Sequence, residues 1–141
     1  MLHLMTTPEE ELATTLIMLP FAYDNFEEFY HFSIELEDDI IPRLERLSNP
    51  TYASSSIEKE VQLAAFHPSF QFAGADFNDP LNFEKRAPFP TLNLLRAERV
   101  RVYSSQKKST CIAESNEETL LNIGSEKLIR DFERIVKLAL D

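Results

Sequence analysis

The segment of residues 61–96, VQLAAFHPSFQFAGADFNDPLNFEKRAPFPTLNLLR, constrains the fold more than any other part of the chain. It opens with an apolar, β-prone run that His67-Pro68 brings to an end. The residues that follow, as far as Pro90, carry turn-forming pairs rather than helical or strand periodicity. A loop of that length in a compact domain is either functional or disordered. Because the segment holds six of the eleven phenylalanines, we expect an ordered loop, anchored by aromatic side chains, that carries what is specific about the protein.

Length and composition fit one domain. At 141 residues, 43% of them hydrophobic, the chain can bury a core without disulfides or metals. Cys111 is the only cysteine, which excludes an intrachain disulfide and a multi-cysteine zinc site and favours a reducing compartment. No apolar run approaches the roughly 18 residues of a membrane span, and the N-terminal residues resemble neither a signal nor a transit peptide. We therefore expect a soluble protein without a membrane span.

The net charge of −10 comes entirely from the first part of the chain. Residues 1–60 hold 13 acidic and 3 basic side chains, whereas residues 61–141 hold 11 of each. Such a protein lacks the basic surface that normally supplies affinity for nucleic acid or anionic lipid, so we predict no nucleic-acid partner. Residues 85–108 are the exception, with seven basic side chains and one acidic side chain. This basic segment could face an anionic ligand or an acidic partner.

The first half of the chain predicts a strand, a helix and a second strand. Residues 12–19 form a short β-prone apolar run. Over residues 26–47, apolar side chains recur every three or four positions, which is typical of one helix face, and Pro42 should kink or split this helix. A turn-rich connector at 48–56 leads to the strand at 61–66. Strand, helix and strand in this order predict a βαβ unit with parallel strands.

The second half predicts mainly helices. Residues 91–103 read as a helix, although the alternation at 99–102 leaves a strand as an alternative for its end. Residues 104–114 are polar and predict a mobile connection, after which a short helix should end at Gly124. Residues 125–141 form an amphipathic pattern. We therefore expect a single α/β domain: a small, mainly parallel sheet with flanking helices and a long ordered Phe- and Pro-rich loop across one strand edge.

His67 and Arg86 are the strongest candidates for a functional site. His67 follows a predicted strand directly, where open α/β sheets place ligand-binding groups, and could serve as a general base or contact an anion. The alternative is structural: the imidazole bonds a backbone group and fixes the turn before Pro68. Arg86 offers the planar fork that binds phosphate or carboxylate. A structural role and a binding role are equally open for this arginine.

The other reactive side chains give little indication of a catalytic or metal site. Asp76 and Asp79 do not have the spacing of an EF-hand loop and are better explained as turn formers. Cys111 has no His or Asp near it in sequence, and His3 and His31 have no metal-ligand spacing. We predict no metal site, and the sequence implies no particular cofactor.

Three motifs give the chain a specific family resemblance. They are AFHP at 65–68, FQFAG at 70–74 and RAPFPTLNLLR at 86–96. Together they resemble the pattern ASFHPDYQFAG followed by NRSPYPMLHLLRE of domain-of-unknown-function family 1415, which bacteria and plastid-bearing eukaryotes share. The resemblance extends more loosely over residues 12–124, which would form the family-like core. Residues 125–141 would then add a C-terminal amphipathic helix.

The resemblance implies a shared α/β domain and a plastid or cytoplasmic location, but no activity. It also implies a set of common polar residues that are candidates for ligand binding: His67, Gln71, Asn82 and Arg86. The chain departs from the family pattern at Lys85, where the family has Asn. Family members also begin with a Leu-Cys-Pro-Phe segment, a strand and a helix that have no recognisable counterpart before Leu12.

Two functions fit these observations. The first is a noncatalytic binding or accessory domain within a protein assembly, in which a partner covers the sheet edge that the missing N-terminal unit would leave exposed. The acidic first part and the basic segment at 85–108 support that hypothesis. The second is an enzyme or small-molecule binder that uses His67 and Arg86 in one polar pocket to hold an anionic ligand.

Overall fold

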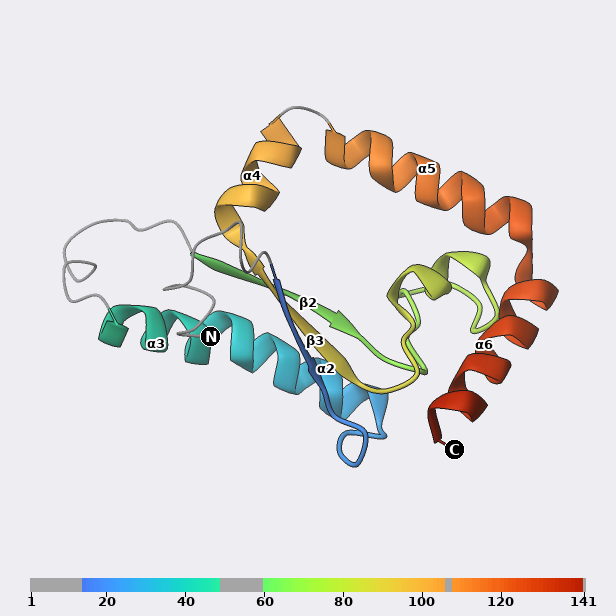
Figure 1. The fold of residues 1–141 in the computed structure, drawn as a ribbon, viewed down its shortest axis with the longest axis horizontal. Helices are drawn as coiled ribbons and strands as arrows, with labels where there is room; N and C mark the ends of the chain where they lie inside the picture. Colours follow the sequence, from blue (N-terminus) through green and yellow to red (C-terminus); the bar gives the residue numbers. More distant parts are fainter. Residues whose placement is uncertain (1–13, 49–59, 106–107, 141) are drawn as a thin grey trace.

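The computed structural model describes residues 14–48, 60–105 and 108–140. Its elements, in chain order, are β1 (Thr14–Met18), α2 (Phe26–Glu35), the π-helical segment η1 (Leu36–Ile40), α3 (Ile41–Ser48), β2 (Val61–Phe66), the 3₁₀ helix η3 (Pro80–Lys85), β3 (Thr91–Arg96), α4 (Ala97–Ser105), α5 (Lys108–Ile123) and α6 (Ser125–Leu140). Figure 1 shows the sheet between the long α2–α3 stretch and a frame formed by α4, α5 and α6. Most of the predicted connector at 48–56 lies outside the described residues.

The sheet has three strands in the order β1-β3-β2, and both pairs are antiparallel. The prediction of a mainly parallel sheet is therefore wrong. β1 and β2 do run in the same direction, because each is antiparallel to β3, but β3 lies between them. The crossover through α2 thus joins two strands that are not neighbours. This crossover is long enough to leave room between β1 and β2, and β3, which comes later in the chain, occupies that position.

β3 occupies residues for which the sequence predicted a helix. Leu92 and Leu94 alternate toward one face of the sheet and are both buried there, so β pairing on two sides replaces the helix that leucine otherwise favours. The predicted helix begins only at Ala97, whose N–H donates to Glu60 O at 2.9 Å. The alternative strand at 99–102 is also wrong, because these residues belong to α4.

The core lies between one face of the sheet and the α2–α3 stretch. Its buried apolar residues are Phe29, Ile41, Val61, Leu63, Leu92 and Leu94. α2 begins at an Asn25 cap, whose side-chain oxygen accepts from Glu28 N–H. Burial of Phe29 and Ile41 holds this stretch against the strands, and it thereby places the start of α2 beside the end of β2.

At Pro42, where the sequence predicted a kink or a split, the long helix departs from regular α-helical geometry but continues. The residues just before it form the π-helical segment η1, in which Ile41 N–H bonds to Leu36 O, five positions back. A proline ring in a regular helix clashes with the carbonyl four residues earlier. The wider π turn relieves that clash without ending the helix, so the helical stretch continues into α3.

Helices α5 and α6 enclose the outer side of the long loop. Residues 108–114, predicted to be part of a mobile connection, instead form the first turns of α5. Gly124 ends α5 with a positive φ of 79°, as the sequence predicted, and α6 follows as an amphipathic helix. Phe132 of α6 packs edge-to-face on Phe83 of η3, with ring centroids 5.9 Å apart. This contact ties the C-terminal helix to the loop.

The start of β2 depends on a buried carboxylate of α3. Glu45 Oε1 accepts from the backbone N–H of Glu60 at 3.1 Å and of Val61 at 3.0 Å. Burial and, to a smaller extent, the charge of Glu45 raise the pKa of neighbouring Glu60 above its ordinary value. Glu45 therefore joins the end of the helical stretch to the first residues of the strand.

Glu45→Ala should lower the free energy of unfolding by roughly 2–4 kcal/mol, because two backbone donors lose their acceptor. Glu45→Gln keeps a carbonyl oxygen at that place and should lose less than half as much. Urea unfolding followed by circular dichroism measures both, with the exposed neighbour Arg46→Ala as control. Equal losses for the alanine and glutamine variants would contradict the role of the oxygen as acceptor.

Candidate functional site

The candidate residues lie in the loop of residues 67–90, which connects β2 to β3 and contains η3 (Figure 1). This 67–90 loop has little regular structure, so its backbone polar groups need partners other than a helix or a sheet. Turns supply some of them, such as Phe70 N–H to His67 O at 3.1 Å and Ala75 N–H to Phe72 O at 3.0 Å. Side chains of the candidate residues supply many of the others.

The His67 side chain is buried, with 1% of its surface exposed, and both of its ring nitrogens are hydrogen-bonded. Nε2 donates to Tyr23 O at 2.9 Å, and Nδ1 accepts from Ser69 N–H at 3.0 Å. The ring also packs against Phe26 and Phe29 of α2, with centroids 5.5 and 5.3 Å away. These bonds fix the neutral tautomer with the proton on Nε2.

Burial holds the pKa of His67 below its ordinary value. The bond to the Tyr23 carbonyl and the charge of Asp24 act in the opposite direction and are weaker. The same bond to Tyr23 holds an unusual backbone, because Tyr23 has a positive φ of 62°. Stacking of the Tyr23 ring on Phe32, with centroids 4.6 Å apart, also stabilises that conformation. His67 thus connects the turn after β2 to the turn between β1 and α2.

Arg86 is sandwiched between two aromatic rings. Its guanidinium carbon lies 4.4 Å from the centroid of Phe77 and 4.5 Å from that of Phe83. Nε donates to Phe70 O at 3.2 Å and Nη2 donates to Phe77 O at 2.6 Å. Burial lowers the pKa of Arg86 from its usual value, although an arginine remains charged at neutral pH. The fork that could bind an anion is directed at two carbonyls of its own loop.

Asn82 is fully buried at 0% exposure and satisfies three backbone groups. Its Oδ1 accepts from Phe72 N–H at 2.9 Å, while Nδ2 donates to Asp76 O at 2.8 Å and Phe77 O at 3.0 Å. Arg86 Nη2 donates to the same Phe77 carbonyl. Asn82 and Arg86 are therefore brought together around one oxygen.

Gln71 and the loop carboxylates make local bonds. Gln71 is exposed, and its Nε2 donates to Ala75 O at 2.7 Å. Asp79 Oδ1 accepts from Leu81 N–H and begins η3, and Asp76 Oδ1 accepts from Asn78 N–H, both at 2.9 Å. The turn-forming role that the sequence suggested for the two aspartates matches these bonds. Within the described ranges, no three His, Cys, Asp or Glu side chains come together as a metal site requires.

The side-chain hydrogen bonds of the four candidates described above all end on backbone groups, so the arrangement acts as a frame that holds the loop. The His67 side chain shares no hydrogen-bond partner with those of Asn82 and Arg86 among the described residues; backbone bonds of His67 to Phe70 and Lys85 connect the two parts of the frame. The ligand-binding role assigned to the four remains a prediction. Sequence reasoning missed Glu45 and the Tyr23 carbonyl. For Glu45, the one sequence signal is a carboxylate on the apolar side of an amphipathic helix. For the Tyr23 carbonyl there is no sequence signal, because every residue has a backbone carbonyl.

The architecture defines a helix-rich α/β domain with a three-stranded antiparallel sheet and a loop held by polar side chains. A family model described as "Protein of unknown function (DUF1415)" matches residues 1–130. The chain therefore belongs to this family, and the match extends beyond both ends of the region 12–124 in which the resemblance was recognised. No curated protein and no solved structure gives a significant match. Among the described helices, none is both long and apolar enough to cross a membrane.

The stability of the protein should fall as the pH is lowered from 7.5 to 5, in part because of His67. Its pKa in the folded state lies below the ordinary 6.5, so the unfolded chain binds the proton more tightly. The contribution of His67 is thus complete above about pH 6.5 and is lost as the pH falls toward the folded-state pKa. Protonation would also place a second donor opposite Ser69 N–H.

The matched variant is His67→Gln, which keeps hydrogen-bonding atoms but does not titrate. Its free energy of unfolding, measured by urea denaturation at several pH values, should depend less on pH than that of the wild type. Identical pH slopes for the two proteins would show that His67 does not contribute in this way.

Asn82→Ala should destabilise the protein by roughly 2–4 kcal/mol, since it leaves three backbone groups without their partner. Gln71→Ala removes one exposed hydrogen bond of the same loop and should cost less than about 1 kcal/mol. Chemical denaturation of the two variants tests the ranking. A loss at Gln71 as large as that at Asn82 would contradict the assignment of Asn82 as the main support of the loop.

Proposed function

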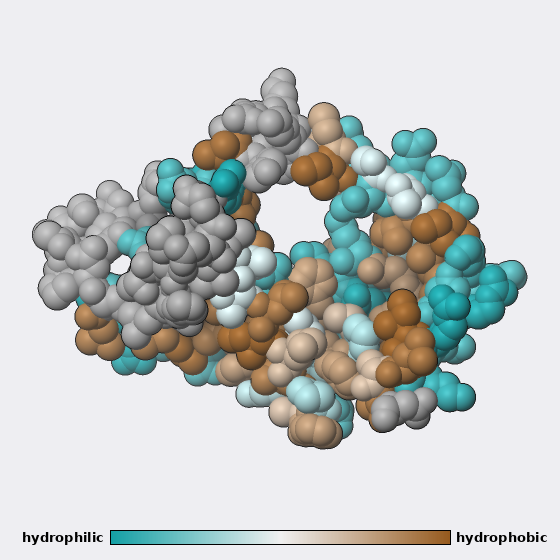
Figure 2. All heavy atoms as spheres, viewed as in Figure 1, coloured by the Kyte–Doolittle hydropathy of each residue, from teal (hydrophilic) through white to brown (hydrophobic). Residues whose placement is uncertain are grey.

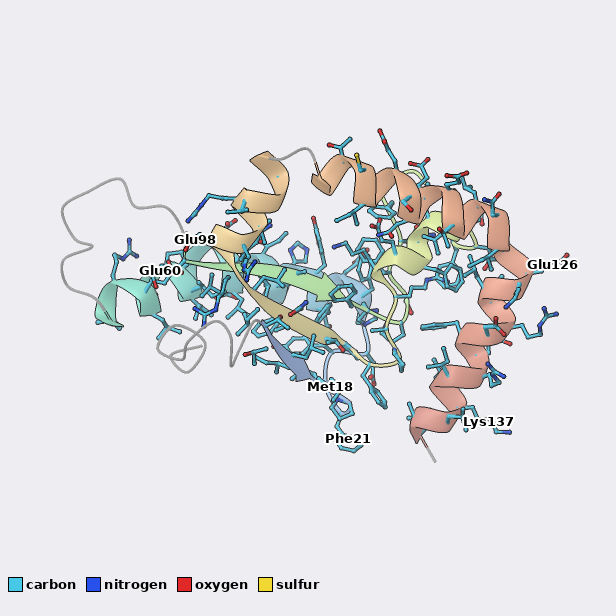
Figure 3. All side chains as sticks on the ribbon, turned by 45° about the horizontal axis from the view of Figure 1, so that its top comes forward. Met18, Phe21, Glu60, Glu98, Glu126 and Lys137 are labelled. Atoms are coloured by element: carbon cyan, nitrogen blue, oxygen red, sulfur yellow. The ribbon has the colours of Figure 1, made fainter. Side chains whose placement is uncertain are left out.

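We propose that this protein is a noncatalytic binding domain that works as a subunit of a protein assembly. The observation that carries the proposal is an exposed apolar surface at β1 and the turn that follows it, which we call the β1 surface: Leu16, Ile17, Met18 and Phe21. Phe21 is 98% exposed, and Leu16 and Met18 are 60% and 63% exposed. Figure 3 shows Met18 and Phe21 projecting away from the rest of the molecule.

The β1 surface has the character of an interface. No charged residue occurs between Thr14 and Tyr23, in a protein whose net charge is −10. Figure 2 shows hydrophobic side chains gathered over this part of the molecule. Exposed apolar surface of this kind commonly marks a site of protein–protein contact. A phenylalanine that gives almost none of its surface to the core has no role in the packing of this domain.

The backbone of β1 also supports a partner at this side. Leu19 N–H donates to Pro90 O, which places the odd-numbered residues of β1 toward β3. The N–H and C=O groups of Leu16 and Met18 therefore point to the outer edge of the sheet. Uncharged edge strands invite pairing with another chain, and proteins usually protect them with charge or cover them.

The anionic-ligand hypothesis has less support from the same geometry. The Arg86 donors Nε and Nη2 and both His67 nitrogens already bond groups of the protein. A ligand would have to displace these bonds or use what remains of the guanidinium. Binding through exposed apolar surface requires no such rearrangement.

Phe21→Ser should lower the recovery of partner proteins at least fivefold in pull-downs of the full chain from its native source, read by quantitative mass spectrometry. Size-exclusion chromatography with light scattering on the purified chain separates self-association from a different partner. Leu138→Ser, which changes an equally apolar exposed residue on α6, is the control and should recover partners normally.

Two results would remove the proposal. One is a stable monomer that recovers the same proteins as an unrelated acidic bait of similar size. The other is a set of specific partners whose recovery is unchanged in Phe21→Ser and in Met18→Lys.

A further inference from the structure

The second free edge of the sheet differs from the β1 edge, because it forms one wall of a groove. A cavity of about 240 Å³ lies between β2 and α2. β2 contributes Leu63, Ala64 and Ala65 to its lining, and Phe70 and Lys85 come from the 67–90 loop. Because these three residues of β2 are consecutive, the cavity extends along the edge strand.

The hydrogen-bond register determines which backbone groups face this groove. Ala97 N–H donates to Glu60 O, so the even-numbered residues of β2 bond to β3 and the odd-numbered residues point outward. The bond from Leu19 N–H to Pro90 O agrees with this register, because it directs the even-numbered residues of β3 toward β1 and leaves the odd-numbered ones to bond to β2. Leu63 and Ala65 therefore present their N–H and C=O groups to the groove, and no hydrogen bond within the described part of the chain engages them.

The two ends of this edge are already covered. At the start of β2, Glu45 Oε1 accepts from Val61 N–H at 3.0 Å. Just after its end, His67 N–H donates to Lys85 O at 3.0 Å. The protein thus satisfies the outward N–H groups of Val61 and His67, on the two sides of Leu63 and Ala65, and leaves a short open window between them. An added strand can pair with Leu63 and Ala65 but not far beyond them, which also limits edge-to-edge aggregation.

The opposite wall is the apolar face of the helical stretch. Its lining residues recur at helical spacing and are Phe26, Phe29, Tyr30, Ser33, Ile34 and Glu37. Tyr30 and Ile34 are exposed, although they are large and apolar along most of their length. A strand placed on the edge of β2 would direct every second side chain toward this wall.

The charges lie at opposite ends of the groove. The ring of Phe26 packs on those of His67 and Phe70. Because the carbonyl of Lys85 accepts from His67 N–H, Lys85 lies at the end of the groove where Phe26 is. Glu37 comes eleven residues later, roughly 16 Å along the helix. Lys85 Nζ lies over the ring of Phe66, 5.2 Å from its centroid, and makes no salt bridge with the described carboxylates. An extended segment of four or five residues spans this distance at about 3.3 Å per residue.

We infer that the groove between β2 and α2 binds an extended peptide segment of a partner protein, which adds one strand to the sheet at Leu63 and Ala65. The segment carries apolar side chains at alternate positions, facing α2, and a carboxylate beside Lys85. Addition of a strand to a sheet edge next to a helix is a known mode of peptide recognition, in which main-chain bonds give affinity and side-chain pockets give specificity. The inference rests on the proposed function, since it names the chemistry of one partner.

A library of random seven-residue peptides displayed on phage, panned against the full chain, tests this directly. The selected peptides, synthesised with a fluorescent label, should show alternate apolar residues and a carboxylate. At saturation, hydrogen exchange followed by NMR should slow at least tenfold at the amides of Leu63 and Ala65, and should be unchanged at those of Leu16 and Met18 on the opposite edge.

Variants separate the parts of the site. Ala65→Pro removes an outward N–H that the sheet does not use, and it should raise the Kd at least tenfold, measured by fluorescence anisotropy. Ile34→Glu changes only the exposed rim and should do the same if the proline variant does not fold. Lys85→Glu should raise the Kd at least fivefold for carboxylate-bearing peptides. Phe21→Ser should bind them as the wild type does.

Several outcomes would overturn the inference. They are no enrichment of peptides over the bare support, equal affinity for wild type and for both groove variants, or slow exchange of the Leu63 and Ala65 amides in the free protein. Protection that appears only at high protein concentration would identify a second copy as the occupant and would also overturn it. The proposed role in an assembly is tested separately by the pull-downs with Phe21→Ser, and the peptide-binding result does not decide it.

Discussion

Burial of Asn82 is the constraint on which the rest of the structure depends. A loop without regular structure must find partners for its backbone, and here one buried amide bonds three of its groups. Arg86 joins the same centre through the Phe77 carbonyl, and His67 fixes the loop where it leaves β2. Because the loop is held in this way, the chain reaches the sheet again at a defined place, where β3 begins.

The insertion of β3 between β1 and β2 decides the properties of the surface. A central strand leaves both of the other strands at an edge, and α2 covers one face of the sheet. The two edges then differ for local reasons. β1 carries exposed apolar side chains and no charge, whereas β2 is closed at both ends by Glu45 and Lys85 and lies beside the helix. An open apolar surface and a short groove suit different kinds of contact.

Local signals in the sequence predicted much of the framework. β-branched and apolar runs marked β1 and β2, Pro42 marked the interruption of the long helix, and Gly124 marked the end of α5. The motifs of the 67–90 loop also identified the family. The failure at β3 has a tertiary cause. Leu92 and Leu94 favour a helix by local propensity, and only pairing with strands distant in sequence made them β3. The polar residues of the loop were recognised, but their carbonyl partners carry no residue-specific signal.

Composition and local pattern were enough to predict that residues 67–90 form an ordered, anchored loop, that the chain is acidic, and which four polar side chains of the loop stand out. These follow from composition, turn chemistry and motif, all of which act over short distances. Tertiary structure alone decided that the sheet is antiparallel, that the four side chains bond the backbone, and that β1 and β2 are the edge strands of the described part of the sheet. Each of these depends on which distant segments lie side by side, and that choice is made by packing of the whole core rather than by any one segment.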